Sequence, residues 1–253
     1  MRSRNTFLLA LLVTPFLSLP VQAQPDLSGY WMISFGQVPP NRPASPEEQG
    51  MIDELPSGVL LLRDSGLVEL PPGETGGLKL TERAKREAAS YDIETQRSVS
   101  TTCRPPSIIY SMQGPFPIEI HQGRDLIVIR MEYFDVVRVI FLNETTHPDD
   151  WPHSVNGHSI GHWEGDTLVV ETSHIQASTM LNNGVNHSDD MHLTERFRLA
   201  DDGKTLLITQ VYDDPTMWEG LAARLIPLDR MEGHVYPYDC DPSYGAAIES
   251  REQ

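Results

Sequence analysis

Short alternating segments separated by tight turns constrain the fold of this chain more than any other feature. From Ser107 onward, apolar side chains recur at every second position, which is the spacing of β-strands with one buried face. The links between segments are short, as in "EGD" at 164–166 and "ADDGK" at 200–204, and short links favour antiparallel neighbours. Strands are therefore predicted at 108–112, 118–121, 126–133, 136–142, 159–163, 167–172, 191–199, 206–212 and 223–228.

Consecutive short strands leave exposed edges unless the sheet closes on itself. A further strand is expected in "DLSGYWMISF", where Trp31 and Ile33 alternate with Met32 and Ser34. The sequence therefore predicts an all-β fold, an antiparallel meander barrel of about eight or nine strands, which is a size that can hold one small ligand.

Glu195 stands out in the strand predicted at 191–199. One face of that strand is apolar apart from this carboxylate, with Met191, Leu193, Glu195, Phe197 and Leu199 in a single row. A buried carboxylate is costly, so Glu195 must be paired, hydrogen-bonded or protonated. A structural tie and a functional role both remain open for this residue.

Two other rows supply partners for Glu195. Arg138 shares its row with Val136, Ile140 and Leu142, so it is expected to face the interior and to pair with Glu195. Tyr133 falls in the apolar row of the strand predicted at 126–133. We therefore expect a polar pocket in the barrel that contains Glu195, Arg138, Tyr133 and one or two histidines.

The first part of the chain differs from the rest. Residues 1–23 combine Arg2 and Arg4 with an apolar run and end in "VQA", the pattern of a secretory signal peptide cleaved after Ala23. A single domain over 24–253 follows, in which 38–95 form a loop-and-helix elaboration rich in Pro and Gly. Thr81 is expected to cap a helix over 81–92.

Composition and cysteine content restrict the partners and the compartment. The formal net charge of −17 argues against binding to nucleic acid or to an anionic membrane, and no stretch predicts membrane insertion. The chain has only Cys103 and Cys240, which are expected to form a disulfide in an oxidising periplasmic or secreted location. A catalytic thiol is the alternative, without a Cys-x-x-Cys motif to support it.

The histidines raise the question of chemistry. His147, His153, His158 and His162 lie close together in sequence, and His187 and His192 flank an acidic run. No HExxH motif or nucleotide-binding loop is present, and no Ser lies in the strand-to-helix turn of a nucleophile elbow, so neither a metal nor another cofactor is predicted. Acid–base chemistry is favoured, with Glu195, His158 and His192 as catalytic candidates.

Other residues are candidates for binding a substrate. These are Arg138 as an electrostatic anchor, Tyr133, His187 and Trp163. Trp163 lies in "WEGD", where packing at the end of a strand is the simpler interpretation. For each histidine taken singly, a surface or loop position is the simpler interpretation.

Two resemblances accompany these patterns. Gly29 and Trp31 in "DLSGYW" resemble the Gly-x-Trp signature of the first lipocalin strand, which implies a lipocalin-like barrel. Most of the chain after position 24 resembles a large uncharacterised family of exported bacterial proteins, through "CRPPS", "RVI", "HP", "GHSIGHWEGDTLVVET" and "HSDDMHLTERF". The family usually ends with His-Glu-Gly-Asn after a cysteine, and this chain has "CDPSYGAAI" instead. The residues that fit the pattern are Arg138, His147, His158, Trp163, Asp166, His187, His192 and Glu195.

The sequence thus predicts an exported enzyme that uses acid–base chemistry on a small, mostly apolar metabolite, as a hydratase or dehydratase, an isomerase or a cyclase. A non-catalytic binder of a hydrophobic small molecule is the first alternative. An interaction module of the cell envelope is the second.

Overall fold

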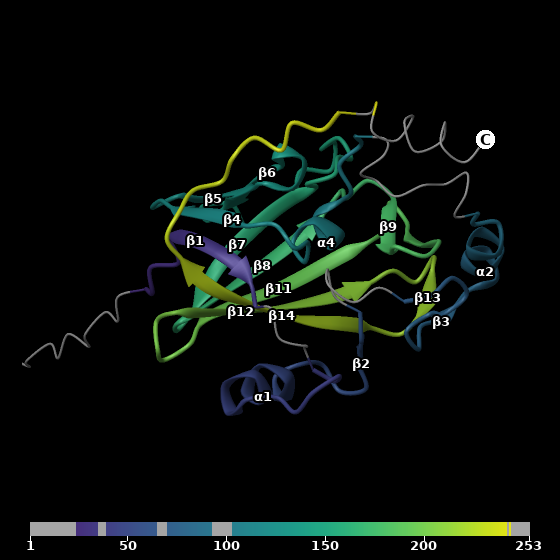
Figure 1. The fold of residues 1–253 in the computed structure, drawn as a ribbon, viewed down its shortest axis with the longest axis horizontal. Coiled ribbons are helices and arrows are strands. Elements are labelled where there is room, and N and C mark those ends of the chain that lie inside the picture. Colours follow the sequence, from purple (N-terminus) through teal and green to yellow (C-terminus); the bar gives the residue numbers. More distant parts are fainter. Residues whose placement is uncertain (1–23, 35–38, 65–69, 93–102, 242, 244–253) are drawn as a thin grey trace, which may run out of the picture.

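A closed β-barrel forms the body of the protein, as the alternation predicts (Figure 1). The computed structural model describes residues 24–34, 39–64, 70–92, 103–241 and 243, so the predicted signal peptide lies outside the described residues. The barrel strands are β1 (Gly29–Ile33), β4 (Ile118–Gln122), β5 (Leu126–Met131), β6 (Val137–Phe141), β7 (His158–Glu164), β8 (Thr167–Ser173), β11 (His192–Leu199), β12 (Thr205–Asp213) and β14 (Ala222–Met231).

The first and last strands close the barrel. β1 pairs antiparallel with β14, where Trp31 lies opposite Arg230, and with β4 on its other side. The prediction of a purely antiparallel meander is wrong at one place, because β6 and β7 run parallel, with Ile140 opposite Ser159. Two parallel neighbours need a long connection, and residues 142–157 form it on the outside of the barrel.

The barrel interior is packed with apolar side chains. Alternate residues point inward, such as Ile127 and Ile129 of β5 and Leu206 and Ile208 of β12, and all four are buried. Since burial of a Leu or Ile side chain contributes about 1.5–3 kcal/mol, this core supplies the main drive for closure. Phe197 of β11 belongs to the same core.

Several shorter elements pack around the nine barrel strands. Helix α1 (Pro46–Asp53) packs Met51 against β12 and β14, and α2 (Glu82–Ala89) lies beside a small hairpin formed by β9 and β10 (Figure 1). Thr81 caps α2, as predicted. The other short elements are β2 (Leu60–Leu61), β3 (Lys79–Leu80), β9 (Ser178–Leu181), β10 (Val185–His187) and β13 (Trp218–Glu219).

Two predicted strands differ from the structure. Residues 108–112 form a short helix, α4 (Ile108–Ser111), which is fully buried. The strand predicted at 126–133 ends at Met131, and a 3-10 turn, η1 (Tyr133–Asp135), follows it. An all-round apolar sequence such as "SIIYSM" fits a buried helix as well as a strand, so period alone could not separate the two.

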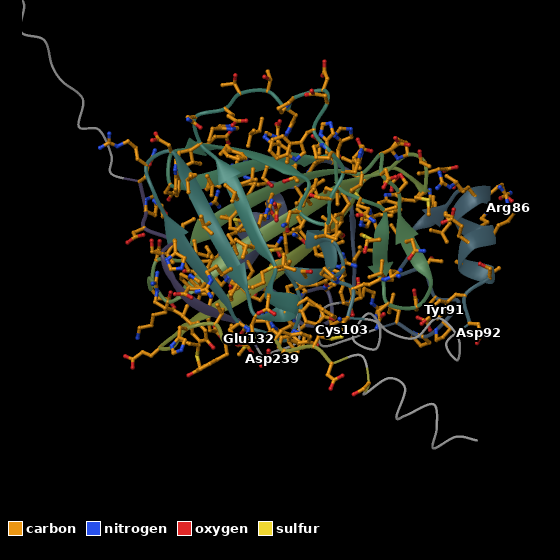
Figure 2. All side chains as sticks on the ribbon, turned by 90° about the horizontal axis from the view of Figure 1, so that it is seen from above. Arg86, Tyr91, Asp92, Cys103, Glu132 and Asp239 are labelled. Atoms are coloured by element: carbon orange, nitrogen blue, oxygen red, sulfur yellow. A yellow bond between two sulfur atoms is a disulfide. The ribbon has the colours of Figure 1, made fainter. Side chains whose placement is uncertain are left out.

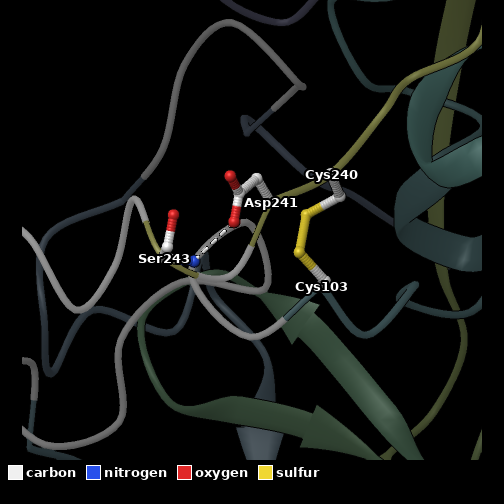
Figure 3. Close-up of a disulfide and its surroundings, with 4 residues drawn as sticks. All are labelled: Cys103, Cys240, Asp241 and Ser243. Atoms are coloured by element: carbon white, nitrogen blue, oxygen red, sulfur yellow. Dashed lines mark hydrogen bonds between the residues drawn. A yellow bond between two sulfur atoms is a disulfide. The ribbon is translucent and has the colours of Figure 1, made fainter.

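The C-terminal tail returns across one end of the barrel. Cys240 forms the predicted disulfide with Cys103, with Cα atoms 5.6 Å apart (Figure 3). Nearby, Asp241 Oδ1 accepts a hydrogen bond from Ser243 N at 2.8 Å. Figure 2 shows Glu132 and Asp239 together at this edge, well away from Arg86 of α2. Among the described residues, no helix is long and apolar enough to cross a membrane.

Candidate functional site

Arg138 and Glu195 meet inside the barrel, as the comparison of strand rows predicts. Arg138 Nη1 donates to Glu195 Oε1 at 3.1 Å, and Nη2 donates to Glu195 Oε2. Both side chains are completely buried. Arg138 also donates to Ser159 Oγ at 3.1 Å and to Thr172 Oγ1 at 2.9 Å. The guanidinium thus ties β6 to β7, β8 and β11.

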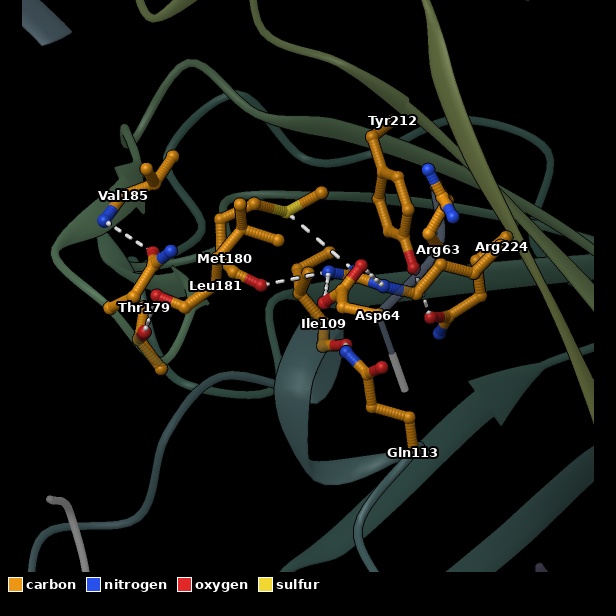
Figure 4. A network of polar contacts seen from close by, with 12 residues as sticks. Arg63, Asp64, Ile109, Gln113, Thr179, Met180, Leu181, Val185, Tyr212 and Arg224 are labelled. Atoms are coloured by element: carbon orange, nitrogen blue, oxygen red, sulfur yellow. Dashed lines mark hydrogen bonds and ion pairs between the residues drawn. The ribbon is translucent and has the colours of Figure 1, made fainter. Parts of the chain in front are cut away.

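The polar chain continues along β12 to a second buried ion pair. Gln210 Nε2 donates to Glu195 Oε1 at 2.9 Å, and the Tyr212 hydroxyl donates to Gln210 Oε1 at 2.6 Å. Arg224 lies over the ring of Tyr212, donates to Asp64 at 3.2 Å from Nε, and donates to the Met180 carbonyl at 2.9 Å (Figure 4). Burial raises the pKa of Tyr212 to about 12, so this hydroxyl stays protonated.

This arrangement favours a structural role for Glu195. Both of its oxygens accept hydrogen bonds from Arg138, and one also accepts from Gln210. A general base needs a lone pair directed at its substrate, and these carboxylate oxygens are occupied by side chains of the core. The pair joins β6 to β11 inside the barrel.

A histidine cluster lies on the outer wall, at the parallel junction. His147 Nδ1 lies 2.8 Å from His158 Nδ1, which is a hydrogen-bond distance between two imidazoles. On its other side, His158 Nε2 lies 3.1 Å from Glu144 Oε2, with angles outside good hydrogen-bond geometry. Glu144, His158 and His147 therefore form a line from a carboxylate through a buried ring to a half-buried ring.

Aromatic rings hold this line in place. Trp151 packs on His158 with centroids 4.4 Å apart, and Phe141 stacks on it at 5.2 Å. His174 lies 6.4 Å from His147 by ring centroids, and its own backbone has a φ of 57°. The 142–157 connection supplies Trp151 and His147, so the parallel junction builds the cluster.

Burial lowers the pKa of both His147 and His158 below the usual value of an imidazole. For His147, the neighbouring His158 and His174 lower the pKa further, while Glu171 opposes them. For His158, Glu144 opposes the effect of burial. Both rings are therefore neutral near pH 7.

The proton positions follow from the two contacts. The carboxylate of Glu144 favours a proton on His158 Nε2, so His158 Nδ1 is the acceptor in the short contact and His147 Nδ1–H is the donor. This tautomer leaves the lone pair of His147 on Nε2. His147 can then take up a proton while His158 and Glu144 hold its orientation.

The other predicted site residues lie apart from this cluster. His187 is buried in β10, where its Nε2 is 2.7 Å from Ser107 Oγ and its Nδ1 donates to the Ser188 carbonyl at 3.0 Å. His192 is exposed on the outer face of β11. His192 does not reach the interior with Glu195, because its row on β11 faces outward. His187 contacts Ser107 and Ser188 and has no hydrogen bond with Glu195 among the described residues.

The two aromatic candidates for substrate binding, Tyr133 and Trp163, both pack against other side chains. Tyr133 packs its ring against Phe116 at 4.9 Å and against Tyr238 at 5.6 Å, so it contributes to an aromatic cluster rather than to the predicted polar pocket. Trp163 is partly buried against the barrel core near the end of β7. Asp166, in the turn after β7, is exposed.

Metal and cofactor binding gain no support from the described part of the chain. Within it, no group of three or more His, Cys, Asp or Glu side chains is arranged to hold a metal ion. In the histidine cluster, the two Nδ1 atoms that face each other are engaged in one hydrogen bond, so neither is directed at a shared metal position.

Sequence reasoning missed part of the cluster. His147 and His153 were grouped with His158 by sequence proximity, but Glu144, Trp151 and His174 carried no signal. They lie in loops, where no periodicity assigns a side chain to a face. The one available indication was the density of His and Trp between two strands.

No family model matches this chain. No curated protein matches it either.

Proposed function

We propose that this protein is an exported enzyme that performs acid–base chemistry on a small, mostly apolar metabolite, with His147 as the group that accepts and returns the proton. The reaction class is that of a hydratase or dehydratase, an isomerase or a cyclase, all of which need proton transfer without a nucleotide cofactor. The observation that carries the proposal is the line from Glu144 through His158 to His147 Nε2.

Three features support this assignment over one based on Glu195. His147 is half-buried and within reach of solvent, whereas Glu195 is fully enclosed. Burial lowers the pKa of His147, so the ring is unprotonated near neutral pH and its free nitrogen can accept a proton. His158 and Glu144 orient it, in the way that a third group orients the base in other acid–base sites. Export is supported by the Cys103–Cys240 disulfide together with the predicted signal peptide.

The test uses solvent exchange, because the substrate is not known. The mature protein is incubated in D₂O with a metabolite extract, and mass spectrometry follows deuterium uptake and products of changed mass or retention. We expect wild type to change at least one component. His147→Gln should lower that rate at least about 100-fold, the usual contribution of a general base.

The matched control is His162→Gln, an exposed histidine on β7, the strand that also carries His158. Its rate should equal that of wild type. The pH profile adds a second readout: activity should be lost as pH falls through the lowered pKa of His147, because the protonated ring cannot act as a base. If the protein binds a component of the extract but never converts it, the proposal of an enzyme is refuted and the alternative of a non-catalytic binder is supported.

A further inference from the structure

A groove lies on the outer face of the barrel, two strands away from His158 of the histidine cluster. It has a volume of about 340 Å³ and runs over β11 and β12, under the residues that follow α1. Pockets that hold small organic ligands start at about this volume. The described residues that line the groove lie on the outer face, so it is separate from the polar chain inside the barrel.

Strand register relates the groove to His158, which lies two strands away from β11. His158 lies opposite Ser173 on β8, and Leu193 of β11 lies opposite Thr172. His192 is therefore beside Ser173, and His192 in turn lies opposite Asp213 on β12. Neighbouring strands are about 4.8 Å apart, so one outward row leads from the histidine cluster to Asp213 in the groove.

The groove combines an apolar wall with one carboxylate that lacks a partner. Leu55, Pro56, Val211 and Leu221 provide the apolar surface. Asp213 is exposed, and among the described residues no side chain forms a hydrogen bond or ion pair with its carboxylate. The side chain of Asp213 thus remains available to a ligand.

The positive charge in the groove is already neutralised. Arg196 Nη1 contacts Glu164 Oε2 at 3.0 Å, and its Nε lies 3.3 Å from Glu54 Oε2. Glu54 also pairs with Arg198 at 2.8 Å. An anionic ligand would have to displace these carboxylates, and the formal charge of −17 on the whole chain also repels anions.

We infer that this groove binds a small organic cation with an apolar body, with its ammonium group on Asp213 and its body against Leu55, Val211 and Leu221. This site goes beyond the proposed function, because it is defined by charge and shape and does not depend on any proton transfer by His147. Charge complementarity selects the head group, and the apolar wall selects the chain.

The experiment measures binding of n-octylammonium to the mature protein by calorimetry, with octanoate as the probe of opposite charge and equal length. We expect saturable one-site binding of octylammonium and none of octanoate. Amide resonances of Thr194 and Val211 should shift in a ¹H–¹⁵N spectrum, which locates the site in the groove.

Asp213→Asn is the decisive variant, and Asp201→Asn is its matched control at the other end of the same hairpin. We expect Asp213→Asn to weaken octylammonium binding about tenfold, as loss of a charge-assisted hydrogen bond does, and Asp201→Asn to leave it unchanged. Equal affinities of wild type and Asp213→Asn would overturn the inference. So would binding of octanoate as tight as that of octylammonium, or no saturable binding of octylammonium at all.

Discussion

Arg138 and Glu195 are both fully enclosed, so each is stable in the barrel only because the other is present. Arg138→Met should destabilise the protein by about 3–5 kcal/mol, because it leaves an uncompensated carboxylate in the core. The double variant Arg138→Met with Glu195→Leu should recover most of that loss. Urea unfolding of the single and double variants measures both effects.

The control for this pair is Arg130→Met. Arg130 forms an exposed ion pair with Glu119 at 3.2 Å on the outside of the barrel, and exposed pairs contribute only about 0–1 kcal/mol. A double variant less stable than Arg138→Met alone would contradict the view that the ion pair, rather than each side chain singly, is the stabilising unit.

The alternation of side chains between the two faces of a strand predicted this residue pair correctly. Arg138 and Glu195 lie in apolar rows, and the structure brings them together. The same reasoning could not predict that Gln210, Ser159 and Thr172 would complete the hydrogen bonds. Polar residues of that size fit either face, and only the cross-strand register decides which of them meet the ion pair.

At the scale of single elements, the start of β7 depends on Gly157. Its φ is 62°, and a Cβ there would lie 2.4 Å from the Ser173 carbonyl oxygen. Gly157→Ala should therefore cost more than the roughly 1–2 kcal/mol of a left-handed alanine alone, with about 1–3 kcal/mol added by the clash. It should also move His158, which follows directly, and change the imidazole resonances of the histidine cluster.

Gly165 provides the comparison, because its φ is 63° but a Cβ added there would meet no neighbouring atom within 4 Å in the described part of the chain. Gly165→Ala should show only the conformational cost. Urea unfolding of the two variants separates the two contributions, and equal losses in both would show that the contact with Ser173 has no energetic weight.

Helix α1 lies in a segment whose Pro and Gly content is typical of a loop. Ser45 accepts a hydrogen bond from Glu48 N at 3.2 Å, and Glu48 Oε2 accepts from Ser45 N at 2.8 Å. This capping box and Pro46 at the first turn are visible in "SPEE", but the surrounding Pro and Gly residues favoured a loop. Local capping signals therefore outweigh the average composition of a segment in this chain.

For the whole molecule, the disulfide is the main covalent constraint. Cys103 and Cys240 are 137 residues apart, and closing a loop of that size contributes about 3–5 kcal/mol by the chain-entropy model. Replacing both cysteines with serine should lower Tm by several degrees. Wild type in reductant should shift toward the same Tm, and the double variant should not respond to reductant.

An unchanged Tm in the serine variant would mean that hydrogen bonds hold the C-terminal tail without the disulfide. Those bonds run from Tyr236 N to Glu132 Oε2 and from Tyr238 N to Asp135 Oδ1, each at 3.0 Å.

The barrel itself could be predicted because most of its strands show the same alternation of apolar and polar side chains, which is a strong signal of a sheet with one buried face. The parallel pairing of β6 and β7 could not, since a single parallel pair has the same alternation as an antiparallel one. The histidine cluster depends on that pairing. The sequence showed only a high density of His and Trp in this region, and the contribution of Glu144 and the arrangement of the rings required the three-dimensional path of residues 142–157.

Closure of the barrel by β1 and β14 has a consequence for the order of events in folding. The two partners are separated by nearly the whole described chain, with Tyr30 opposite Met231, so the ring cannot be completed until the last strand has been synthesised. Contacts this distant in sequence slow folding, and until then β1 and β12 each have an open edge. A chain truncated before β14 should therefore expose two unpaired edges at once and aggregate instead of forming a smaller barrel.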